Sequence, residues 1–502
     1  MKKRQNLTTG VLLMVAIILV VNVFSYFYFF RIDFTKDRRY TLSQPTKDIL
    51  ASLTKPVTIT AYYSENSIPA ISRARADLKD MLTEYAARSG NKVVFNFINP
   101  NKNDSLEKIA QRNGVSPFPV QVREKDEMKN VKVYLGAVVK MGDKTDVLPL
   151  IDPNGSLEFT LSNSIKKLSI DKKPLVGLLE GNGEPALTDM QQVEAAVDAL
   201  HTMKEIKLSG NLPIPADYNT LALISPKDTF SPGQLQQLDA FLARGGQLLI
   251  GYSGLTADLR NGVGRLGNNI NLAGWLAEKG IVLDNKYVID ARCGNVTVPQ
   301  NGMNFNVSFP FLPMIGNFAN HPVTKDLRSV LLTFASDILF TGDTNKVKFT
   351  PLAFTSDKSG LETIPAKFDL EHKWEQSEFP FANLVVAAAV SGVDGNKNAR
   401  IIIVANNDFA VNGSGKQAMK LEQDNVDLFA NSVDWLSDNT GLIELRSKVA
   451  KFVPIKDVSD GEKLFLKYFN FSFPILLVII YGIIRMQVKK RIRTKRMEEI
   501  YD

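Results

Sequence analysis

The chain has 502 residues, of which 44% are hydrophobic and 23% are charged, a balance that is typical of folded domains and excludes a disordered or low-complexity protein. Its formal net charge is +7, but residues 1–30 contribute +3 and residues 485–502 contribute +4, so residues 31–484 are neutral. The folded part therefore lacks the net basic charge that favours nucleic-acid binding, and we expect no nucleic-acid partner.

The first notable segment is an uncharged apolar stretch, residues 10–30, which follows a short basic terminus, residues 1–9. As a helix, its 21 residues would span the roughly 30 Å hydrocarbon core of a bilayer. A cleaved signal peptide has a shorter apolar core, whereas this stretch ends in "YFYFF", which is typical of a membrane interface. We predict an uncleaved transmembrane helix in which the amide of Asn22 contacts a neighbouring helix.

Residues 31–56 are predicted to connect this helix to the first folded domain. They include "RYTLSQPT" (39–46), in which Thr41 or Ser43 can cap a helix through "QPTKDILASL", with Pro45 in its first turn. A plain connector without a helix is the alternative interpretation.

Residues 57–152 alternate between strand and helix patterns and are predicted to form a small α/β domain. Its predicted strands lie within residues 57–63, 92–100, 114–122 and 131–151. Ser105 can cap the second helix, and the last strands form a hairpin around "GDK". This βαβαββ order resembles a thioredoxin-like domain, with Pro119 where that fold often has a cis proline. A redox function is excluded because the loop after the first strand, "SENSIPA", has no Cys-x-x-Cys pair.

Residues 173–440 are predicted to form a larger α/β domain. Continuous apolar runs favour buried parallel strands, with helix patterns between them. These runs lie at 174–179, 220–225, 247–254 and 399–412. Thr188 and Gln191 are expected to form a capping box, Ser231 before a proline marks a second helix start, and residues 424–436 predict an amphipathic helix.

This domain resembles the class I glutamine-amidotransferase-like fold, which is a Rossmann-like α/β fold. In that fold a Gly-Gly pair and a strand lead to a Gly-x-Cys-x-Gly turn that presents the nucleophile. Aligning the last glycine with Gly254 places Tyr252 at the cysteine position, and a phenol does not replace a thiolate. We therefore predict a relative without enzymatic activity. It carries an insertion near residues 255–320, of which residues 291–320 show no assignable pattern.

Residues 441–464 are predicted to link this domain to a second transmembrane helix, residues 465–484. Asn470 and the kink at Pro474 are the expected contacts of this helix within the membrane. The tail, residues 485–502, carries seven basic and three acidic side chains, and basic flanks mark the cytoplasmic side of a membrane helix. We predict a two-pass protein of the cytoplasmic membrane, with both termini in the cytoplasm and the large domain outside.

Several short motifs occur in a fixed order along the chain. They are "DFTKDRRYTLSQPTKDILASLTKPVTITAYYS" (33–64), "LEGNGEP" (179–185), "NHPVT" (320–324), "NDFAVN" (407–412), "NSVDWL" (431–436) and "GLIELRSK" (441–448). In this order they resemble GldG-type proteins, the gliding-motility-associated auxiliary components of ABC transporters. The resemblance implies a permease and an ATPase in separate chains, and the sequence has no G-x-x-x-x-G-K-[ST] phosphate-binding loop. It does not by itself imply motility.

The strongest candidate for a ligand-binding site is the loop "EGNGE" (180–184). It follows a predicted parallel strand and lies at the sheet edge where α/β folds bind ligands. The ligand would be a protein or a glycan outside the membrane. The candidate ligand-binding residues are Glu180, Asn182, Gly183, Glu184 and, at the end of a neighbouring strand, Asp408. The alternative is a tight turn in which glycine supplies a positive φ.

We expect neither a metal site nor a cofactor. The three histidines, His201, His321 and His372, are widely separated, and none has a metal-binding spacing. The single cysteine, Cys293, excludes an intramolecular disulfide.

The sequence as a whole predicts a non-enzymatic, membrane-anchored auxiliary subunit of an ABC-type transport system. Its partners would be the permease and ATPase subunits and the lipid bilayer. One alternative is an envelope hydrolase on an amidotransferase-like scaffold, against which the missing nucleophile argues. Another is a structural envelope protein without a transport role, which an ATPase gene and a permease gene beside this one would exclude.

Overall fold

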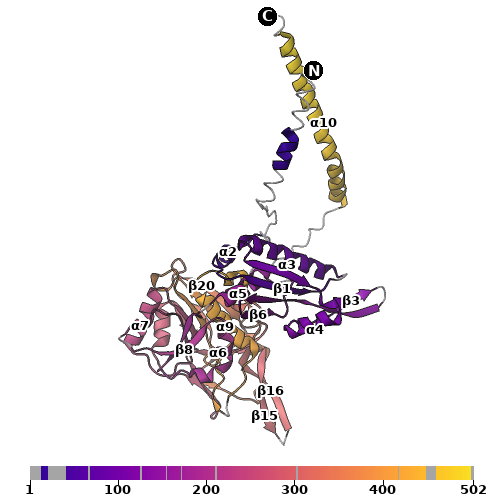
Figure 1. Ribbon diagram of the computed structural model, residues 1–502. Helices are drawn as coiled ribbons and strands as arrows, with labels where there is room; N and C mark the ends of the chain where they lie inside the picture. Colours follow the sequence, from indigo (N-terminus) through magenta and orange to yellow (C-terminus); the bar gives the residue numbers. More distant parts are fainter. Residues whose placement is uncertain are drawn as a thin grey trace. The chain divides into compact units, whose positions relative to one another are not determined.

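The computed structural model describes residues 13–20, 41–65, 68–124, 127–153, 155–170, 172–209, 212–300, 303–415, 418–447 and 460–498. The chain divides into two compact units, Met1–Ala450 and Lys451–Asp502. Residues 13–20 are helical and exposed, while the rest of the first predicted membrane helix, Asn22 included, lies outside the described residues. In Figure 1, the colours of the first unit run from indigo through magenta to orange along two α/β modules.

The connector before the first module forms a helix, α2 (Gln44–Ala51). Ser43 is its N-cap, because the Ser43 hydroxyl accepts a hydrogen bond from the Thr46 amide at 3.4 Å. The Ser43 amide donates to Oε1 of Glu158 at 2.7 Å, and Glu158 belongs to helix α5 (Leu157–Ser169). The predicted helix and its Ser43 cap are thus confirmed, and the connector is fixed to the folded module.

The first module contains a four-stranded sheet in the order β2-β1-β5-β6. Its strands are β1 (Val57–Tyr63), β2 (Val93–Ile98), β5 (Leu135–Met141) and β6 (Lys144–Leu148). β1 and β2 are parallel, whereas β5 is antiparallel to both β1 and β6. The hairpin predicted around "GDK" is the turn between β5 and β6, where Gly142 has a positive φ of 57°.

Helices cover both faces of this sheet. Helix α3 (Pro69–Arg88) packs with α2 and α5 on one face, and α4 (Asp104–Arg112) packs on the other. The first core contains Ile59, Leu82 and Ile165, and the second contains Tyr62, Ala110 and Val138. Alternate residues of one strand reach opposite cores, as the two-residue period of a strand requires.

The next strand pattern forms a separate hairpin rather than a strand of the main sheet. β3 (Phe118–Glu124) pairs only with β4 (Glu127–Val133) among the described strands. The more apolar β5 takes the place beside β1, because nearly all of its residues are buried there. The expectation of a cis proline at Pro119 is wrong: in the described part of the chain, the cis peptide bond precedes Pro365.

Two predicted helix starts are also wrong. The N-cap of α4 is Asn103 rather than Ser105, and its Oδ1 accepts a hydrogen bond from the Leu106 amide at 2.9 Å. Thr188 and Gln191 form no capping box. A 3₁₀ turn occupies Leu187–Asp189. Helix α6 (Gln191–Val197) therefore begins only after Met190, and no side chain caps it.

The second module is built on an eight-stranded sheet in the order β17-β20-β23-β24-β10-β9-β7-β8. The last five strands in this order are parallel. All of them except β8 correspond to the predicted apolar runs. They are β24 (Arg400–Val404), β10 (Gln247–Gly251), β9 (Tyr218–Ile224), β7 (Leu175–Glu180) and β8 (Thr202–Lys207). Three antiparallel strands extend the sheet: β23 (Val385–Ser391), β20 (Lys348–Phe354) and β17 (Asn317–Phe318).

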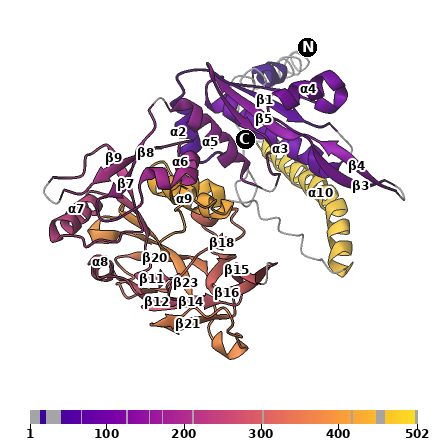
Figure 2. The ribbon, with the colours of Figure 1, turned by 90° about the horizontal axis from the view of Figure 1, so that it is seen from below.

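Helices also cover both faces of the larger sheet. α6 and α9 (Gln423–Ser437) lie together on one face, as Figure 2 shows, and α7 (Pro232–Ala243) and α8 (Leu272–Glu278) pack on the other. The capping box predicted at Ser231 is present at the start of α7. Alternate residues separate into the two cores, with Ala222 and Ile402 in the first and Leu221 and Ile401 in the second.

Shorter strands build the insertion between β10 and β24. They are β11 (Leu255–Asp258), β12 (Val263–Leu266), β13 (Ile281–Leu283), β14 (Lys286–Asp290), β15 (Cys293–Gln300), β16 (Met303–Ile315), β18 (Val330–Leu331), β19 (Ile338–Phe340), β21 (Ser359–Thr363) and β22 (Ala366–Lys367). The segment that the sequence leaves unassigned is the long β15–β16 hairpin. Tyr287, Phe311 and Phe368 contact one another edge to face in the core of the insertion.

The second unit contains one long helix, α10 (Asp460–Glu498). Between Leu464 and Thr494 it is long and apolar enough to cross a membrane, and its side chains there are exposed. This range contains the predicted membrane helix, residues 465–484. Asn470 and Pro474 both lie within the helix. The contacts predicted for their side chains within a membrane stay predictions.

Candidate functional site

The "EGNGE" loop lies at the point in the larger sheet where ligands bind in related architectures. The chain passes from β7 outward to β8 and then returns to β9 on the other side of β7. Loops at the carboxyl ends of β7 and β9 therefore point in opposite directions and border a crevice. These loops are residues 181–186 and 225–231. The strand order thus places the "EGNGE" loop at the edge of the sheet where the sequence predicts it.

Asn182 joins the loop after β7 to the loop after β9. Its backbone oxygen accepts hydrogen bonds from the amides of Lys227 and Asp228, both at 2.8 Å. Its Nδ2 donates to the Thr229 oxygen at 3.1 Å, and its Oδ1 accepts from Nε2 of Gln234 at 2.9 Å. Asn182 is only 5% exposed. These contacts give Asn182 a structural role, which is the alternative that the sequence left open.

The two glycines of the loop are required by its backbone. Gly181 has a φ of +115° and Gly183 a φ of +80°, in the region that side chains disfavour. A Cβ at Gly183 would also lie 2.9 Å from Cβ of Lys227. The loop is therefore a tight turn packed against its neighbour.

The two glutamates of the loop are held by internal contacts. Oε2 of Glu184 accepts the Asn182 amide at 2.6 Å, and Glu180 lies 3.4 Å from the ammonium of Lys207. Burial raises the pKa of Glu184, and the charges of Asp228 and Glu180 act in the same direction. A carboxyl with a raised pKa at a sheet edge is compatible with a ligand site, but its hydrogen bond closes the turn.

Asp408 follows β24 and lies near the same edge. Its side chain reaches solvent, yet the surrounding protein desolvates the carboxyl enough to raise its pKa, while the charge of Lys227 acts in the opposite direction. Its amide donates to Oδ1 of Asn406 at 2.9 Å. The structure thus joins Asn182, Gly183 and Glu184 closely, and it relates Asp408 to them through Lys227.

Tyr252 and Ser253, after β10, occupy the position compared with a nucleophile turn. Tyr252 is 6% exposed, and burial raises the pKa of its phenol. Asn407 clamps the next residue: its Oδ1 accepts the Ser253 amide and its Nδ2 donates to the Ser253 hydroxyl, both at 3.1 Å. Ser253 thus joins the loops after β10 and β24, and Tyr252 belongs to the hydrophobic core.

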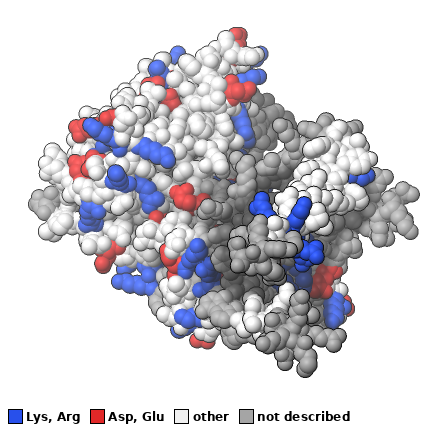
Figure 3. Space-filling view, turned by 90° about the horizontal axis from the view of Figure 1, so that it is seen from above, with Lys and Arg blue, Asp and Glu red and all other residues white. Residues whose placement is uncertain are grey.

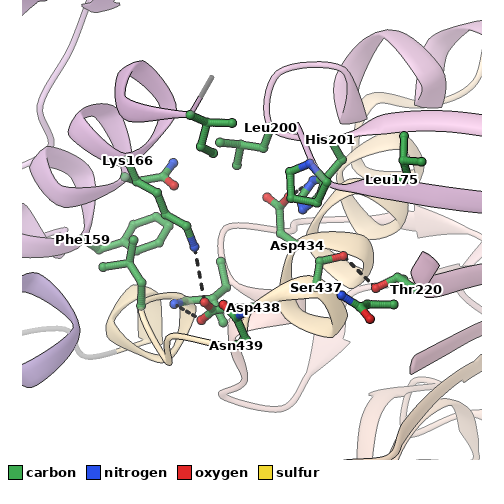
Figure 4. A pocket seen from close by; sticks show the side chains of 16 residues that line it. Phe159, Lys166, Leu175, Leu200, His201, Thr220, Asp434, Ser437, Asp438 and Asn439 are labelled. Carbon is green, nitrogen blue, oxygen red and sulfur yellow. Dashed lines mark hydrogen bonds and ion pairs between the residues drawn. The ribbon is translucent and has the colours of Figure 1, made fainter. Parts of the chain in front are cut away.

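A cavity at the opposite edge of the sheet was not foreseen from the sequence. It has a volume of about 130 Å³ and lies between α5, the amino ends of β7 and β9, and the carboxyl end of α9 (Figure 4). We call it the junction cavity. Its polar lining comprises Asn163, Lys166, His201, Asn219, Thr220, Asp434, Ser437, Asp438 and Asn439, and its apolar lining includes Phe159, Leu175, Leu200 and Ile443.

His201 is the most unusual residue of the junction cavity. It is 7% exposed, and its Nδ1 has no hydrogen-bond partner although it lies 3.4 Å from Oδ1 of Asp434. Burial lowers the pKa of His201 to about 4, and the charge of Lys166 acts in the same direction. The imidazole is therefore neutral near pH 7, so its contact with Asp434 is not an ion pair.

The two carboxylates of the cavity have opposite environments. Burial raises the pKa of Asp434 to about 6; Arg446 and Lys166 oppose this shift and Asp438 adds to it. Burial would also raise the pKa of Asp438, but hydrogen bonds from Thr440 and Ile443 and the charge of Lys166 outweigh it and lower the pKa. Lys166 lies 3.4 Å from Oδ1 of Asp438 and is thus already paired.

No part of the described chain resembles a metal centre. Among the described residues, no group of three or more His, Cys, Asp or Glu side chains is arranged to hold a metal ion. His321 caps a 3₁₀ turn through Nδ1, which accepts the Val323 amide at 3.3 Å, and contacts Trp435 edge to face. Cys293 is half-buried, and burial raises the pKa of its thiol.

Charge is mixed on the face drawn in Figure 3, where basic and acidic side chains lie among one another. This agrees with the neutral balance of residues 31–484. The described residues of this face form no continuous basic surface of the kind that binds nucleic acids.

Relatives of the chain are distant. An uncharacterized protein of Borreliella burgdorferi (strain ATCC 35210 / DSM 4680 / CIP 102532 / B31) is 22% identical over 518 residues, which cover 98% of this chain and all of that protein. Among solved structures, the mmIFT52 N-terminal domain has a TM-score of 0.36 at 12% identity and covers 53% of this chain and 98% of that one. A ThuA-like protein from Parabacteroides merdae ATCC 43184 has a TM-score of 0.31 at 13% identity, with 57% and 94% covered. Scores this low do not assign a fold.

Two family profiles match most of the chain between residues 36 and 438. A profile described as a domain of unknown function (DUF7088) matches residues 36–140. A second profile, of the auxiliary components described as "ABC-type uncharacterized transport system", matches residues 173–438, which is more than half of the 502 residues. The matched range contains the whole sheet from β7 to β24 and ends just after α9. The chain therefore belongs to the family of ABC-type uncharacterized transport system auxiliary components.

Proposed function

We propose that the protein is a non-enzymatic, membrane-anchored subunit that works beside the permease and ATPase of an ABC-type transporter, in the manner of GldG-type proteins. The observation that carries this proposal is the family match over residues 173–438. The helix α10 supports it, because between Leu464 and Thr494 it is long and apolar enough to anchor the chain in a membrane.

A two-pass arrangement is supported by where the ends of the first unit lie. Leu42 and Leu50, in the segment after the first predicted membrane helix, share a core with Leu442 and Leu445, in the segment before the second. Ile165 of α5 belongs to the same core. Both ends of the folded unit therefore lie in the same core as α5. This arrangement suits an exported unit that is tied to one bilayer at both ends. The basic residues at 2–4 and 485–496 favour cytoplasmic termini.

The finer fold assignments also belong to this proposal. The order β2-β1-β5-β6, with a parallel first pair and an antiparallel second pair, supports a thioredoxin-like first module. The parallel strands β8-β7-β9-β10-β24, with helices on both faces, support a Rossmann-like, amidotransferase-like second module. Tyr252 in place of a thiol supports a role in binding rather than in catalysis.

Purification of the whole complex tests the proposal. The full-length protein with a C-terminal tag would be extracted gently in detergent from cells that express the neighbouring genes, and the copurifying chains identified by mass spectrometry. We expect a multi-spanning permease and an ATPase in fixed proportion to this chain. The variant Asn22→Leu tests the contact within the membrane. It leaves the first predicted membrane helix apolar but removes its amide, so it should reduce recovery of the permease. A preparation that contains only this chain would contradict the proposal.

A further inference from the structure

The junction cavity lies where several parts of the first unit meet. Lys166 comes from α5 of the first module, His201 is the residue before β8, Asp434 lies in α9, and Asp438 is the residue that ends α9 (Figure 4). The cavity is also lined by Ile443, in the segment that leads out of the second module. A ligand bound here would therefore contact both modules and the segment that leaves them.

The lining carries one negative charge in excess. Lys166 is a cation paired with Asp438, and His201 is neutral, so Asp434 has no cation of its own among the lining residues. The charges just outside cancel one another: the cations are Arg400 and Arg446, and the carboxylates are Asp326 and Glu444. The Asp434 side chain is 24% exposed, and a carboxylate that has lost most of its water without gaining a paired cation is costly. The cavity therefore favours a cation and disfavours an anion.

His201 sets a second requirement for a ligand, in addition to a positive charge. Its Nδ1 is buried, has no hydrogen-bond partner among the described residues and lies 3.4 Å from Oδ1 of Asp434, and both residues line the cavity. Buried polar atoms in proteins are nearly always paired, by a protein group, a water or a ligand. A ligand with two or three N–H donors on one nitrogen can satisfy both His201 and Asp434.

Two other kinds of cation fit less well. A transition metal would need a third protein ligand, and no such group of three occurs among the described residues. An alkali or alkaline-earth ion prefers oxygen ligands throughout, which an imidazole nitrogen does not supply. Leu175 and Leu200 add an apolar wall, which suits a short carbon chain rather than a bare ion.

We propose that the junction cavity binds a small primary ammonium compound, with its nitrogen held between the Asp434 carboxylate and Nδ1 of His201. A volume of about 130 Å³ limits the ligand to a size on the order of six non-hydrogen atoms, by comparison with cavities that hold one benzene molecule. The raised pKa of Asp434 agrees with a carboxylate that lacks its cation. This site is independent of the transport role.

Isothermal titration calorimetry on the full-length protein in detergent tests the site. The probe is propylammonium chloride in a buffer without primary amines, with 1-propanol, sodium propionate and potassium chloride as matched controls. We expect saturable binding of propylammonium with a Kd of about 1 mM, as the size of so small a ligand allows. None of the three controls should bind saturably.

Two substitutions locate the binding. Asp434→Asn should weaken propylammonium binding at least tenfold, and His201→Asn at least threefold. The control Asp146→Asn removes a carboxylate that pairs with Lys167. Lys167 follows Lys166 on α5, but neither Lys167 nor Asp146 lines the cavity. This variant should bind propylammonium as the wild type does. Thermal unfolding curves show which variants fold. Unchanged affinity in either folded variant, equal binding of 1-propanol, or no saturable heat up to about 50 mM would each overturn the proposal.

Discussion

Asp434→Asn is expected to stabilise the protein at neutral and alkaline pH and to have little effect in acid. Burial raises the pKa of this carboxyl from 3.8 to about 6. The folded state therefore binds more protons than the unfolded state between these two values, and the free energy of unfolding falls as the pH rises through them. Asparagine does not titrate, so the variant avoids this loss.

The size of the effect follows from the shift. A change of about two pKa units corresponds to roughly 3 kcal/mol at most. The Asp434 side chain is 24% exposed, so solvent screening reduces this figure and we expect about 1–2 kcal/mol. In a protein of this size the melting temperature should rise by on the order of a few °C above about pH 7. Below about pH 4 the variant and the wild type should unfold alike.

Thermal unfolding followed by tryptophan fluorescence measures this difference, on the full-length protein in detergent and without primary amines. His201 and Asp337 also have shifted pKa values, of about 4 and about 6 respectively. Comparing the variant with the wild type at each pH removes their contributions. The control Asp146→Asn should show no stabilisation at any pH. A variant that is less stable than the wild type near pH 8, or a shift that does not depend on pH, would refute the reasoning.

Three further predictions concern the fold and the topology. Tyr85→Phe removes a buried hydroxyl that lies 2.6 Å from that of Ser162 and donates to a backbone oxygen, so urea unfolding should show a loss of about 1–2 kcal/mol. Gly183→Ala places a side chain at a φ of +80° and should cost about 1–3 kcal/mol in the same assay, without loss of propylammonium binding. In a cysteine-free background, cysteines at the exposed positions Thr54 and Thr494 should differ in intact spheroplasts: an impermeant thiol reagent should label only the first, and labelling of the second alone would reverse the topology.

The parts of the fold that the sequence predicts are those fixed by local patterns. Four of the five parallel strands are continuous apolar runs, and each is long enough to stand out between helices, whereas the edge strand β8 is largely polar and was not predicted. Ser43 and Ser231 are recognisable because a cap needs only residues within one turn of itself. The same logic fails at Thr188, where a 3₁₀ turn, favoured by contacts elsewhere, takes the place of the expected first turn.

The parts that the sequence does not predict depend on contacts between distant segments. α5 contributes to the core of the first module and lines the junction cavity, but its position follows from packing against β5, β6 and α2. The contact between His201 and Asp434 joins residues 233 positions apart. Asp434 lies in the motif "NSVDWL" (431–436), but His201 lies in none of the motifs, and nothing in the sequence pairs the two residues. A lone histidine next to a helix end gives no signal that its Nδ1 will be buried without a partner.

We propose a ligand site at the amino edge of the larger sheet rather than at its carboxyl edge. At the carboxyl edge, where α/β proteins commonly bind ligands, Asn182 joins the loops after β7 and β9 and Asn407 joins the loops after β10 and β24. Hydrogen bonds between loops thus occupy the polar groups that a ligand would otherwise use. At the amino edge, the packing of α5 against the second module leaves a cavity in which Nδ1 of His201 has no hydrogen-bond partner among the described residues. Asp434 has no paired cation among the residues that line this cavity. Unpaired buried groups are costly unless a ligand satisfies them. We therefore expect a ligand in the junction cavity, between the two modules, rather than at the carboxyl edge of the sheet.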